Sequence, residues 1–254
     1  MLGRILDVLF PPACVACGGG SWPFCSRCRG ALATLTPPGC RRCGRPFGAS
    51  VDGCADCPPA SISWARSAFL YEGPARRALV RLKFSGLRST TAALAPWMVW
   101  ALARSPPPAP FLRSSPVITW VPLGPRRLRS RGFDQAEALA RAVGALTGWP
   151  VARLLDRTVE TDPQAKRSGL DRRRALRGAF RARAAAPRPV ILVDDVLTTG
   201  ATAGACASEL RASGATGVGL LCAARSLGGP VPSHCYNPPV SQPGSVVARE
   251  RFSW

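Results

Sequence analysis

The chain has 254 residues and 46% of them are hydrophobic, so it can bury a sizeable core and is not a disordered protein. Lys and Arg total 34 against 14 Asp and Glu, a formal charge of +20. This excess favours an anionic partner, such as nucleic acid, an acidic membrane surface or a phosphorylated metabolite, with a compositional bias toward arginine as the alternative. The single histidine, His234, lies near the end of the sequence, which argues against Ser-His-Asp catalysis and histidine-based metal sites.

The first residues predict a short amphipathic helix. Apolar residues recur at helical spacing from Leu2 to Phe10, and Pro11-Pro12 follow. The segment lacks the basic start and long apolar run of a signal peptide, so we expect it to pack against the domain, with contact to a membrane surface as the alternative. The most apolar later stretch, residues 92–103, is shorter than the about 20 residues that span a bilayer. We therefore expect a cytoplasmic protein, with peripheral binding to the inner face of the membrane left open.

Four C-x-x-C pairs occupy the first 60 residues. Each pair makes a tight turn that directs two thiolates at one point, and two pairs complete the tetrahedral sulfur shell that Zn²⁺ prefers. Disulfides, a redox motif and an iron–sulfur cluster are the alternatives, and the first two are disfavoured by the missing secretory signal and thioredoxin-like pattern. Spacing leaves open whether the pairs combine sequentially or interleave. The prediction is two structural zinc ions held by eight ligands, which are Cys14, Cys17, Cys25, Cys28, Cys40, Cys43, Cys54 and Cys57.

After residue 60, apolar strand-like runs alternate with helical patterns, which predicts an α/β fold with a parallel sheet. The expected strands are Ser67–Tyr71, Val117–Val121, Val190–Val193 and Val218–Cys222. The expected helices are Pro74–Leu82, Thr90–Ala103, Asp134–Leu146 and Ala201–Ala212, with a proline-rich connection at 105–116. We divide the chain into an N-terminal helix and double zinc ribbon at 1–60, an α/β domain at 61–227, and a tail at 228–254 that its Pro and Gly content predicts to be disordered.

Residues 190–202, VILVDDVLTTGAT, carry the clearest chemical signal. An apolar strand ends in Asp194-Asp195, a loop at 196–200 follows, and a helix then begins. Ligands of open α/β sheets bind at the carboxyl ends of the strands, and free N–H groups at a helix start, together with threonine hydroxyls, favour a phosphate. The two carboxylates suit hydrogen bonds from sugar hydroxyls or a Mg²⁺ ion. An acidic turn before a threonine-capped helix is the alternative.

This segment resembles the 5-phosphoribosyl-1-pyrophosphate (PRPP) motif of type I phosphoribosyltransferases. Together with the four cysteine pairs, it makes the chain similar to the ComF family over roughly residues 5–226. Further matches are L-K-F at 82–84, V-P-L at 121–123 and R-G-F-D-Q at 131–135. The segment from Gln164 through the arginines at 172–174 to Phe180 also matches. The resemblance implies a type I phosphoribosyltransferase-like parallel sheet with helices on both faces, preceded by a small zinc-ribbon module.

The resemblance also implies roles for individual residues. Asp194 and Asp195 would hold the ribose hydroxyls of PRPP, and Arg131 and the arginines at 172–174 would lie near a mobile loop over the site. The residues that would cradle the 5-phosphate are Thr198, Thr199, Gly200, Ala201 and Thr202, and those facing the pyrophosphate are Val121, Pro122 and Leu123. Two positions depart from the family pattern, because Asp134 and Ala175 stand where the family has asparagine. No role is carried over to Ala175.

The implied activity is Mg²⁺-dependent transfer of a phosphoribosyl group from PRPP to an acceptor that the sequence does not identify. This chemistry needs positioning and stabilisation of the leaving charge but no histidine. The alternative is handling of single-stranded DNA with the competence machinery during natural transformation, in which the basic surface and zinc ribbons bind the phosphate backbone. A PRPP-sensing module without turnover is the third possibility. We expect most tryptophans to be in the core, and the sequence gives no oligomeric state.

Overall fold

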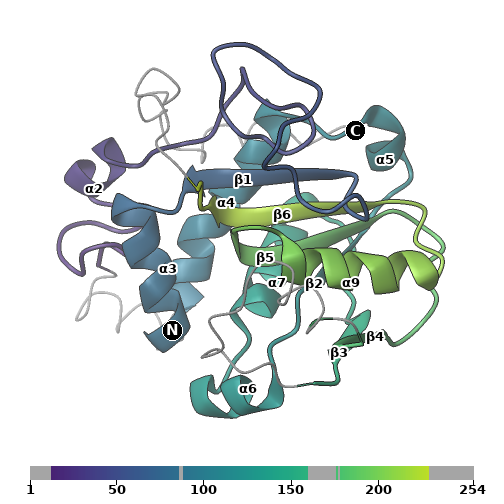
Figure 1. Cartoon of the computed structure of the whole chain (residues 1–254). Coiled ribbons are helices and arrows are strands. Elements are labelled where there is room, and N and C mark those ends of the chain that lie inside the picture. The colour runs from purple at the N-terminus through teal and green to yellow at the C-terminus, as the bar shows by residue number, and fades with distance from the viewer. Residues whose placement is uncertain (1–12, 86–87, 160–175, 177, 229–254) are drawn as a thin grey trace.

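The structure is a computed structural model in which residues 13–85, 88–159, 176 and 178–228 are described (Figure 1). The predicted N-terminal helix, the tail, and the segment from Gln164 to Ala175 with its arginines at 172–174 lie outside the described residues. The strands are β1 (Trp64–Leu70), β2 (Val117–Trp120), β3 (Leu155–Arg157), β4 (Phe180–Ala182), β5 (Val190–Leu197) and β6 (Val218–Arg225). The helices are α2 (Ser26–Gly30), α3 (Gly73–Ser85), α4 (Arg88–Arg104), α5 (Ala109–Arg113), α6 (Pro125–Arg131), α7 (Gln135–Thr147) and α9 (Ala201–Ala212).

Within these described ranges, the main sheet consists of four parallel strands in the order β1-β6-β5-β2. The central strand β6, VGLLCAAR, is buried along its whole length, as expected for a parallel strand covered on both faces. All four predicted strands are present, but three of them are longer than the apolar runs suggested. The predicted loop at 196–200 is partly wrong, because β5 continues through Asp194 and Asp195 to Leu197, where it still pairs with Arg225 of β6.

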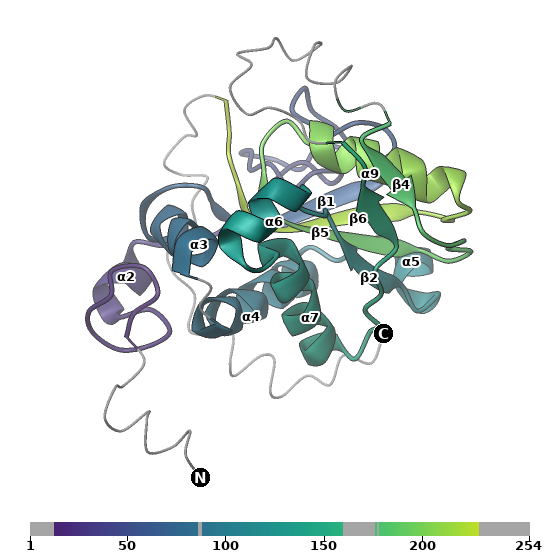
Figure 2. The ribbon, with the colours of Figure 1, turned by 90° about the horizontal axis from the view of Figure 1, so that it is seen from below.

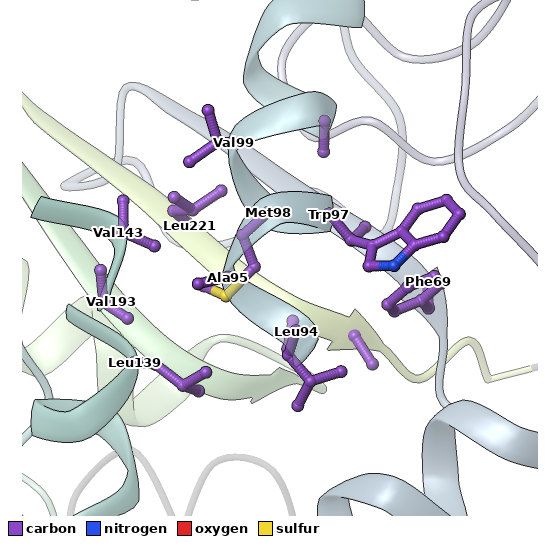
Figure 3. Close-up of a cluster of buried hydrophobic side chains, with 14 of the residues drawn as sticks. Phe69, Leu94, Ala95, Trp97, Met98, Val99, Leu139, Val143, Val193 and Leu221 are labelled. Carbon is purple, nitrogen blue, oxygen red and sulfur yellow. The ribbon is translucent and has the colours of Figure 1, made fainter. Parts of the chain in front are cut away.

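Helices cover both faces of the sheet, so the predicted α/β architecture is confirmed. Figure 2 shows α4 and α7 on one side and α9 on the other. The first face is packed by a cluster in which Met98 of α4 and Leu139 of α7 meet Val193 and Leu221 of the sheet (Figure 3). The second face is packed by α9 and the antiparallel pair of strands β3 and β4. Burial of apolar surface on both faces is the main stabilising contribution to such a layered core.

The predicted helices are confirmed with shifted ends. α9 spans the predicted Ala201–Ala212, whereas α7 begins one residue later than expected because Asp134 is its N-cap and accepts hydrogen bonds from the N–H groups of Ala136 and Glu137. The predicted proline-rich connection contains the short helix α5. The sequence did not indicate α2, α6 or the pair of strands β3 and β4, because each of these elements is too short to show a clear hydrophobic period.

The segment between the two cysteine-rich regions covers the free edge of β1. The N–H of Leu35 donates to the carbonyl of Ala68, and the N–H of Leu70 donates to the carbonyl of Ala33, both at 2.9 Å. An uncovered edge strand would expose unpaired backbone groups to other chains. The segment therefore completes the sheet, and it also delivers the two cysteine-rich regions to different faces of the α/β domain.

Buried side chains agree with that placement. Cys14 and Phe24 of the first region belong to the cluster beneath α3 and α4, whereas Cys40 and Cys43 of the second belong to the cluster beneath α9. The boundary at residue 60 stays a prediction. None of the helices in the described part of the chain is long and apolar enough to cross a membrane.

Candidate functional site

The eight predicted cysteines form two groups of four, and within each group the Sγ atoms lie within 4.8 Å of one another. The first group is Cys14, Cys17, Cys25 and Cys28, and the second is Cys40, Cys43, Cys54 and Cys57. The pairing is therefore sequential, which the spacing had left open. We call residues 13–31 the first ribbon and residues 39–57 the second ribbon.

The sulfur positions suit zinc. Four thiolates placed tetrahedrally at a Zn–S distance of about 2.3 Å have Sγ–Sγ separations of about 3.8 Å. The separations here are 3.9 Å for Cys17–Cys25, 3.6 Å for Cys40–Cys57 and 3.5 Å for Cys43–Cys54. All are far longer than the roughly 2.05 Å of a disulfide. Each ribbon is thus a Cys₄ site with the geometry of structural zinc, and neither has the open position of a catalytic zinc site.

One thiol in each ribbon is set up to ionise. Burial raises the pKa of Cys14, but backbone N–H groups of Cys25, Cys17 and Ala16 outweigh it and lower this pKa to about 6. Burial likewise raises the pKa of Cys43, yet the Arg225 guanidinium and backbone and side-chain hydrogen bonds lower it to about 7. A zinc ion with four thiolates carries a net negative charge, which nearby arginines offset.

These arginines come from the α/β domain. Arg77 of α3 lies 4.0 Å from the Sγ of Cys28 in the first ribbon. Arg225, at the end of β6, is fully buried and donates to the carbonyls of Cys43 and Asp56 in the second ribbon, each at 2.7 Å. The metal sites and the sheet are therefore held together by charge as well as by apolar packing.

The predicted phosphate-binding residues follow β5 at the carboxyl edge of the sheet. Thr198 and Thr199 are exposed, and Gly200 adopts a left-handed conformation with φ of 72° as the N-cap of α9. No side chain caps this helix start, and the hydroxyl of Thr199 accepts only a long bond, 3.4 Å, from the N–H of Ala201. The first turn of α9 therefore presents N–H groups without a strong internal acceptor, which is the arrangement that binds an anion. We call residues 198–202 the phosphate turn.

The two adjacent carboxylates lie in different surroundings, because consecutive residues of a strand point to opposite faces. Asp195 forms an ion pair with Lys83 of α3, with 2.7 Å between Nζ and Oδ2. The side chain of Asp195 is 9% exposed and that of Lys83 is 24% exposed, so the pair is largely shielded from water. Lys83 belongs to the L-K-F match at 82–84, for which no role was predicted.

Asp194 lies on the other side, in a small cavity with Thr199, Thr202, Leu220 and Cys222. Its Oδ1 accepts a hydrogen bond of 2.8 Å from the N–H of Asp195. Burial, and then repulsion from the Asp195 carboxylate, raise the pKa of Asp194 well above its usual value. The two acids are thus unlike each other, one an ion-paired carboxylate and the other a group that resists ionisation.

The loop after β2 lies beside the end of β5. The N–H of Val121 donates to the carbonyl of Val193 at 3.0 Å, and the N–H of Leu123 donates to Oδ2 of Asp134 at 2.9 Å. Asp134 therefore joins this loop to the start of α7. Burial raises the pKa of Asp134 although three backbone N–H groups oppose that shift. In all of these contacts the Asp134 carboxyl serves as an acceptor.

Arg131 ends α6, which follows the loop of Val121, Pro122 and Leu123, and its guanidinium donates to Oε1 of Gln135 at 3.0 Å. β2 leads into α7 on one face, while β5 leads into α9 on the other, so the carboxyl ends of β2 and β5 flank a topological switch point. The predicted loop, both acids and the phosphate turn all border this point. Lys83 joins them from α3, while the arginines at 172–174 lie outside the described residues.

Comparisons with known proteins agree with both parts of the chain. A family model described as a double zinc ribbon domain matches residues 5–58. The DNA utilization protein YhgH of Escherichia coli O157:H7 is 30% identical over 213 residues, which cover 82% of this chain and 92% of that protein. Competence protein F of Haemophilus influenzae is 28% identical, covering 75% and 85% of the two chains. Competence protein ComFC of Bacillus subtilis is 28% identical, covering 70% and 73%.

A solved structure titled as the allosteric regulatory enzyme of purine biosynthesis aligns with 57% of this chain and 30% of its own, at 18% identity and a TM-score of 0.37. The sequence relatives cover 70% to 82% of the chain, and the double-ribbon match at residues 5–58 contains the two Cys₄ sites. The chain therefore belongs to the ComF family of competence proteins, whose members YhgH, competence protein F and ComFC are its relatives.

Proposed function

We propose that the chain binds PRPP together with Mg²⁺ at the switch point between β2 and β5. The observation that carries this proposal is that free backbone N–H groups and two carboxyl groups lie together at the carboxyl edge of the sheet. An uncapped phosphate turn lies on one side of the Asp194-Asp195 pair, and the loop 121–123 lies on the other. A sugar carrying phosphate groups at both ends matches such an arrangement.

In this proposal the phosphate turn holds the 5-phosphate through backbone N–H groups and the hydroxyls of its threonines. Gly200 permits the left-handed turn that exposes those N–H groups. Asp195, paired with Lys83, accepts hydrogen bonds from the ribose hydroxyls. Asp194 contributes a second acceptor from the other side of the strand.

The pyrophosphate would face the loop of Val121, Pro122 and Leu123, with Arg131 as the nearby cation. Among the described residues only the cysteines form a cluster with metal-binding geometry, so Mg²⁺ would arrive with the pyrophosphate and complete its shell with Asp194 or Asp195 and water. Bound there, Mg²⁺ would supply charge neutralisation of the leaving group.

We further propose that bound PRPP donates its phosphoribosyl group to an acceptor nucleophile. The bond between the anomeric carbon and the pyrophosphate oxygen breaks, the acceptor forms a bond to that carbon, and pyrophosphate leaves. The contribution of the protein is positioning and electrostatic stabilisation. A PRPP sensor would bind the same ligand and release no pyrophosphate, so an assay of pyrophosphate release distinguishes the two.

The experiment is titration calorimetry of the zinc-loaded protein with PRPP and Mg²⁺. We expect Asp195→Asn to weaken binding at least about tenfold, equivalent to roughly 1.4 kcal/mol. The matched control is Asp52→Asn, because Asp52 is an exposed carboxylate of the second ribbon that pairs with Arg41. Equal affinity for wild type and Asp195→Asn would remove the ribose-binding assignment.

A second candidate function is binding of single-stranded DNA, with relatives named for DNA utilization and competence. The observation that favours it is α6, PRRLRSR, which carries four arginines and no acidic residue directly beside the switch point. Such a surface would follow a phosphate backbone with strongly salt-dependent affinity. We expect Arg127→Ala/Arg129→Ala to lower the affinity and the salt slope, while Arg113→Ala on α5 changes neither. A flat salt response would contradict this candidate.

A further inference from the structure

We infer that the second zinc ribbon is the positioning element of the phosphate turn, so that phosphate binding at α9 depends on an intact second ribbon and much less on the first. The inference rests on the proposed function only in taking a phosphate as the ligand of the turn. It follows from three sets of contacts that link Cys40–Cys57 to α9 and to the end of β5.

The first link is direct contact between the exit of the second ribbon and the start of α9. Cys57 is followed by Pro58 and Pro59. A methyl group added at Gly200 would lie 2.8 Å from Cβ of Pro58, and one added at Gly204 would lie 2.6 Å from Cγ of Pro59. Both distances are shorter than a Cβ atom tolerates, so positions 200 and 204 accept a larger residue only if the prolines move. The two prolines therefore pack against the backbone of the phosphate turn and of the helical turn that follows.

The second link holds those prolines in place. Arg42, which lies between the ligands Cys40 and Cys43, donates to the carbonyls of Pro58 and Pro59 at 2.8 and 3.0 Å. The hydroxyl of Ser61 then donates to the carbonyl of Gly204 at 3.0 Å. The segment 58–61 is thus fixed to the ribbon at one end and to α9 at the other. The position of segment 58–61 therefore depends on the loop between Cys40 and Cys43, whose two thiols would bind the metal.

The third link runs through β6. Arg225 donates to two carbonyls of the second ribbon, and the next residue, Ser226, donates its N–H to the carbonyl of Leu197 at 2.8 Å. Leu197 immediately precedes the phosphate turn. The ribbon therefore contacts the structure on both sides of the turn, before it through β6 and after it through the prolines.

The first ribbon makes a different set of contacts. Its cysteine Cys28 lies near Arg77 of α3, Gly18 lies against the guanidinium of Arg81, and Trp22 donates to the carbonyl of Ser89 at the start of α4. Within the described residues, none of the hydrogen bonds of this ribbon reaches 198–204. The two ribbons have the same ligand set, so they provide a matched comparison inside one chain.

The experiment compares Cys54→Ser in the second ribbon with Cys25→Ser in the first, each replacing one half-buried ligand. Zinc content is measured by metal analysis, amide hydrogen exchange is followed by mass spectrometry, and ribose 5-phosphate binding is measured by calorimetry. We expect two zinc ions per wild-type chain. We expect exchange at 198–204 to speed up by about tenfold or more in Cys54→Ser, with loss of ribose 5-phosphate binding. In Cys25→Ser the faster exchange should be confined to the first ribbon and α3.

A second pair of variants keeps all eight cysteines. It therefore tests the contact between the second ribbon and α9 even if Cys54→Ser unfolds. Gly204→Ala should push Pro59 away and weaken ribose 5-phosphate binding by about tenfold, although alanine ordinarily stabilises a helix relative to glycine. Adding Pro59→Ala, which removes the obstructing ring, should restore binding and exchange rates toward wild type. Unchanged exchange at 198–204 in both Cys54→Ser and Gly204→Ala would overturn the inference. If wild type does not bind PRPP or ribose 5-phosphate, the proposed function fails, and the exchange rates still report on the coupling.

Discussion

The two zinc ribbons have the same ligands and similar spacing, yet they support different halves of the candidate site. The first packs beneath α3 and α4, and α3 carries Lys83, the partner of Asp195. The second packs beneath α9 and contacts the phosphate turn through Pro58 and Pro59. The difference arises because the segment between the ribbons lies along the edge of β1, from which the chain can reach either face of the sheet.

This comparison suggests that a metal module can be structural and still act on a binding site. Neither ribbon has an open coordination position, so neither has the form of a catalytic metal site. Their effect would be exerted through the elements that they hold in place. We refer to the first ribbon, α3, Lys83 and Asp195 as the sugar half, and to the second ribbon, α9, Asp194 and the phosphate turn as the phosphate half.

The largest effect on stability is expected in the sugar half, from Lys83→Met. This change leaves the shielded Asp195 carboxylate without its opposing charge, which should lower the free energy of unfolding by roughly 3 kcal/mol. Urea denaturation measures the change. The double variant with Asp195→Asn should recover much of the loss because it removes the unpaired charge. Equal stability of wild type and Lys83→Met would show that the pair is solvated and would weaken the distinction between the halves.

An intermediate effect is expected from Asp134→Ala, which belongs to neither half. Asp134 caps α7 and accepts from the N–H of Leu123, so its loss should cost about 1–2 kcal/mol of unfolding free energy. Asp134→Asn retains an acceptor and should cost less. Amide exchange should quicken at the loop 121–124 and at the start of α7. Faster exchange within either ribbon would instead mean that the halves are not independent of this loop.

An effect of opposite sign, which stabilises the protein, is expected in the phosphate half from Asp194→Asn. The folded-state pKa of Asp194 is raised, by burial and then by Asp195, so the folded protein binds more protons than the unfolded chain above the unfolded pKa of about 3.9. The contribution of Asp194 to the free energy of unfolding of the wild type therefore falls as the pH rises from about 3.9 through the folded-state pKa. Asp194→Asn should be the more stable protein at pH 7, and the difference should vanish near pH 4.

Chemical denaturation of wild type and Asp194→Asn between pH 4 and pH 8 tests this sign. A variant that is less stable than wild type across the range would contradict it. Asp195→Asn provides the comparison, because it should destabilise at neutral pH by leaving Lys83 partly shielded without a counter-charge. Two adjacent acids would then give opposite responses to the same substitution.

Much of this protein was determined by local sequence. The strands, the main helices and the start of α9 follow from apolar runs, helical spacing and the glycine at position 200, which are properties of neighbouring residues. The two Cys₄ sites follow from C-x-x-C turns for the same reason. Of the six tryptophans among the described residues, five are buried, as expected, and Trp22 at 40% exposure is the exception.

Other features depend on contacts between segments that are far apart in the sequence. Lys83 and Asp195 are far apart in sequence, and only the packing of α3 against β1 and α4 brings them together. The extension of β5 through both acids depended on its pairing with β6, and the sequential grouping of the cysteines depended on the path along the edge of β1. Local periodicity carries no information on such pairings, since their energy comes from contacts between segments. The sequence by itself therefore determined the main strands and helices and the zinc ligands, and the tertiary structure alone decided which face of the sheet each ribbon packs against, because that depends on contacts between distant segments.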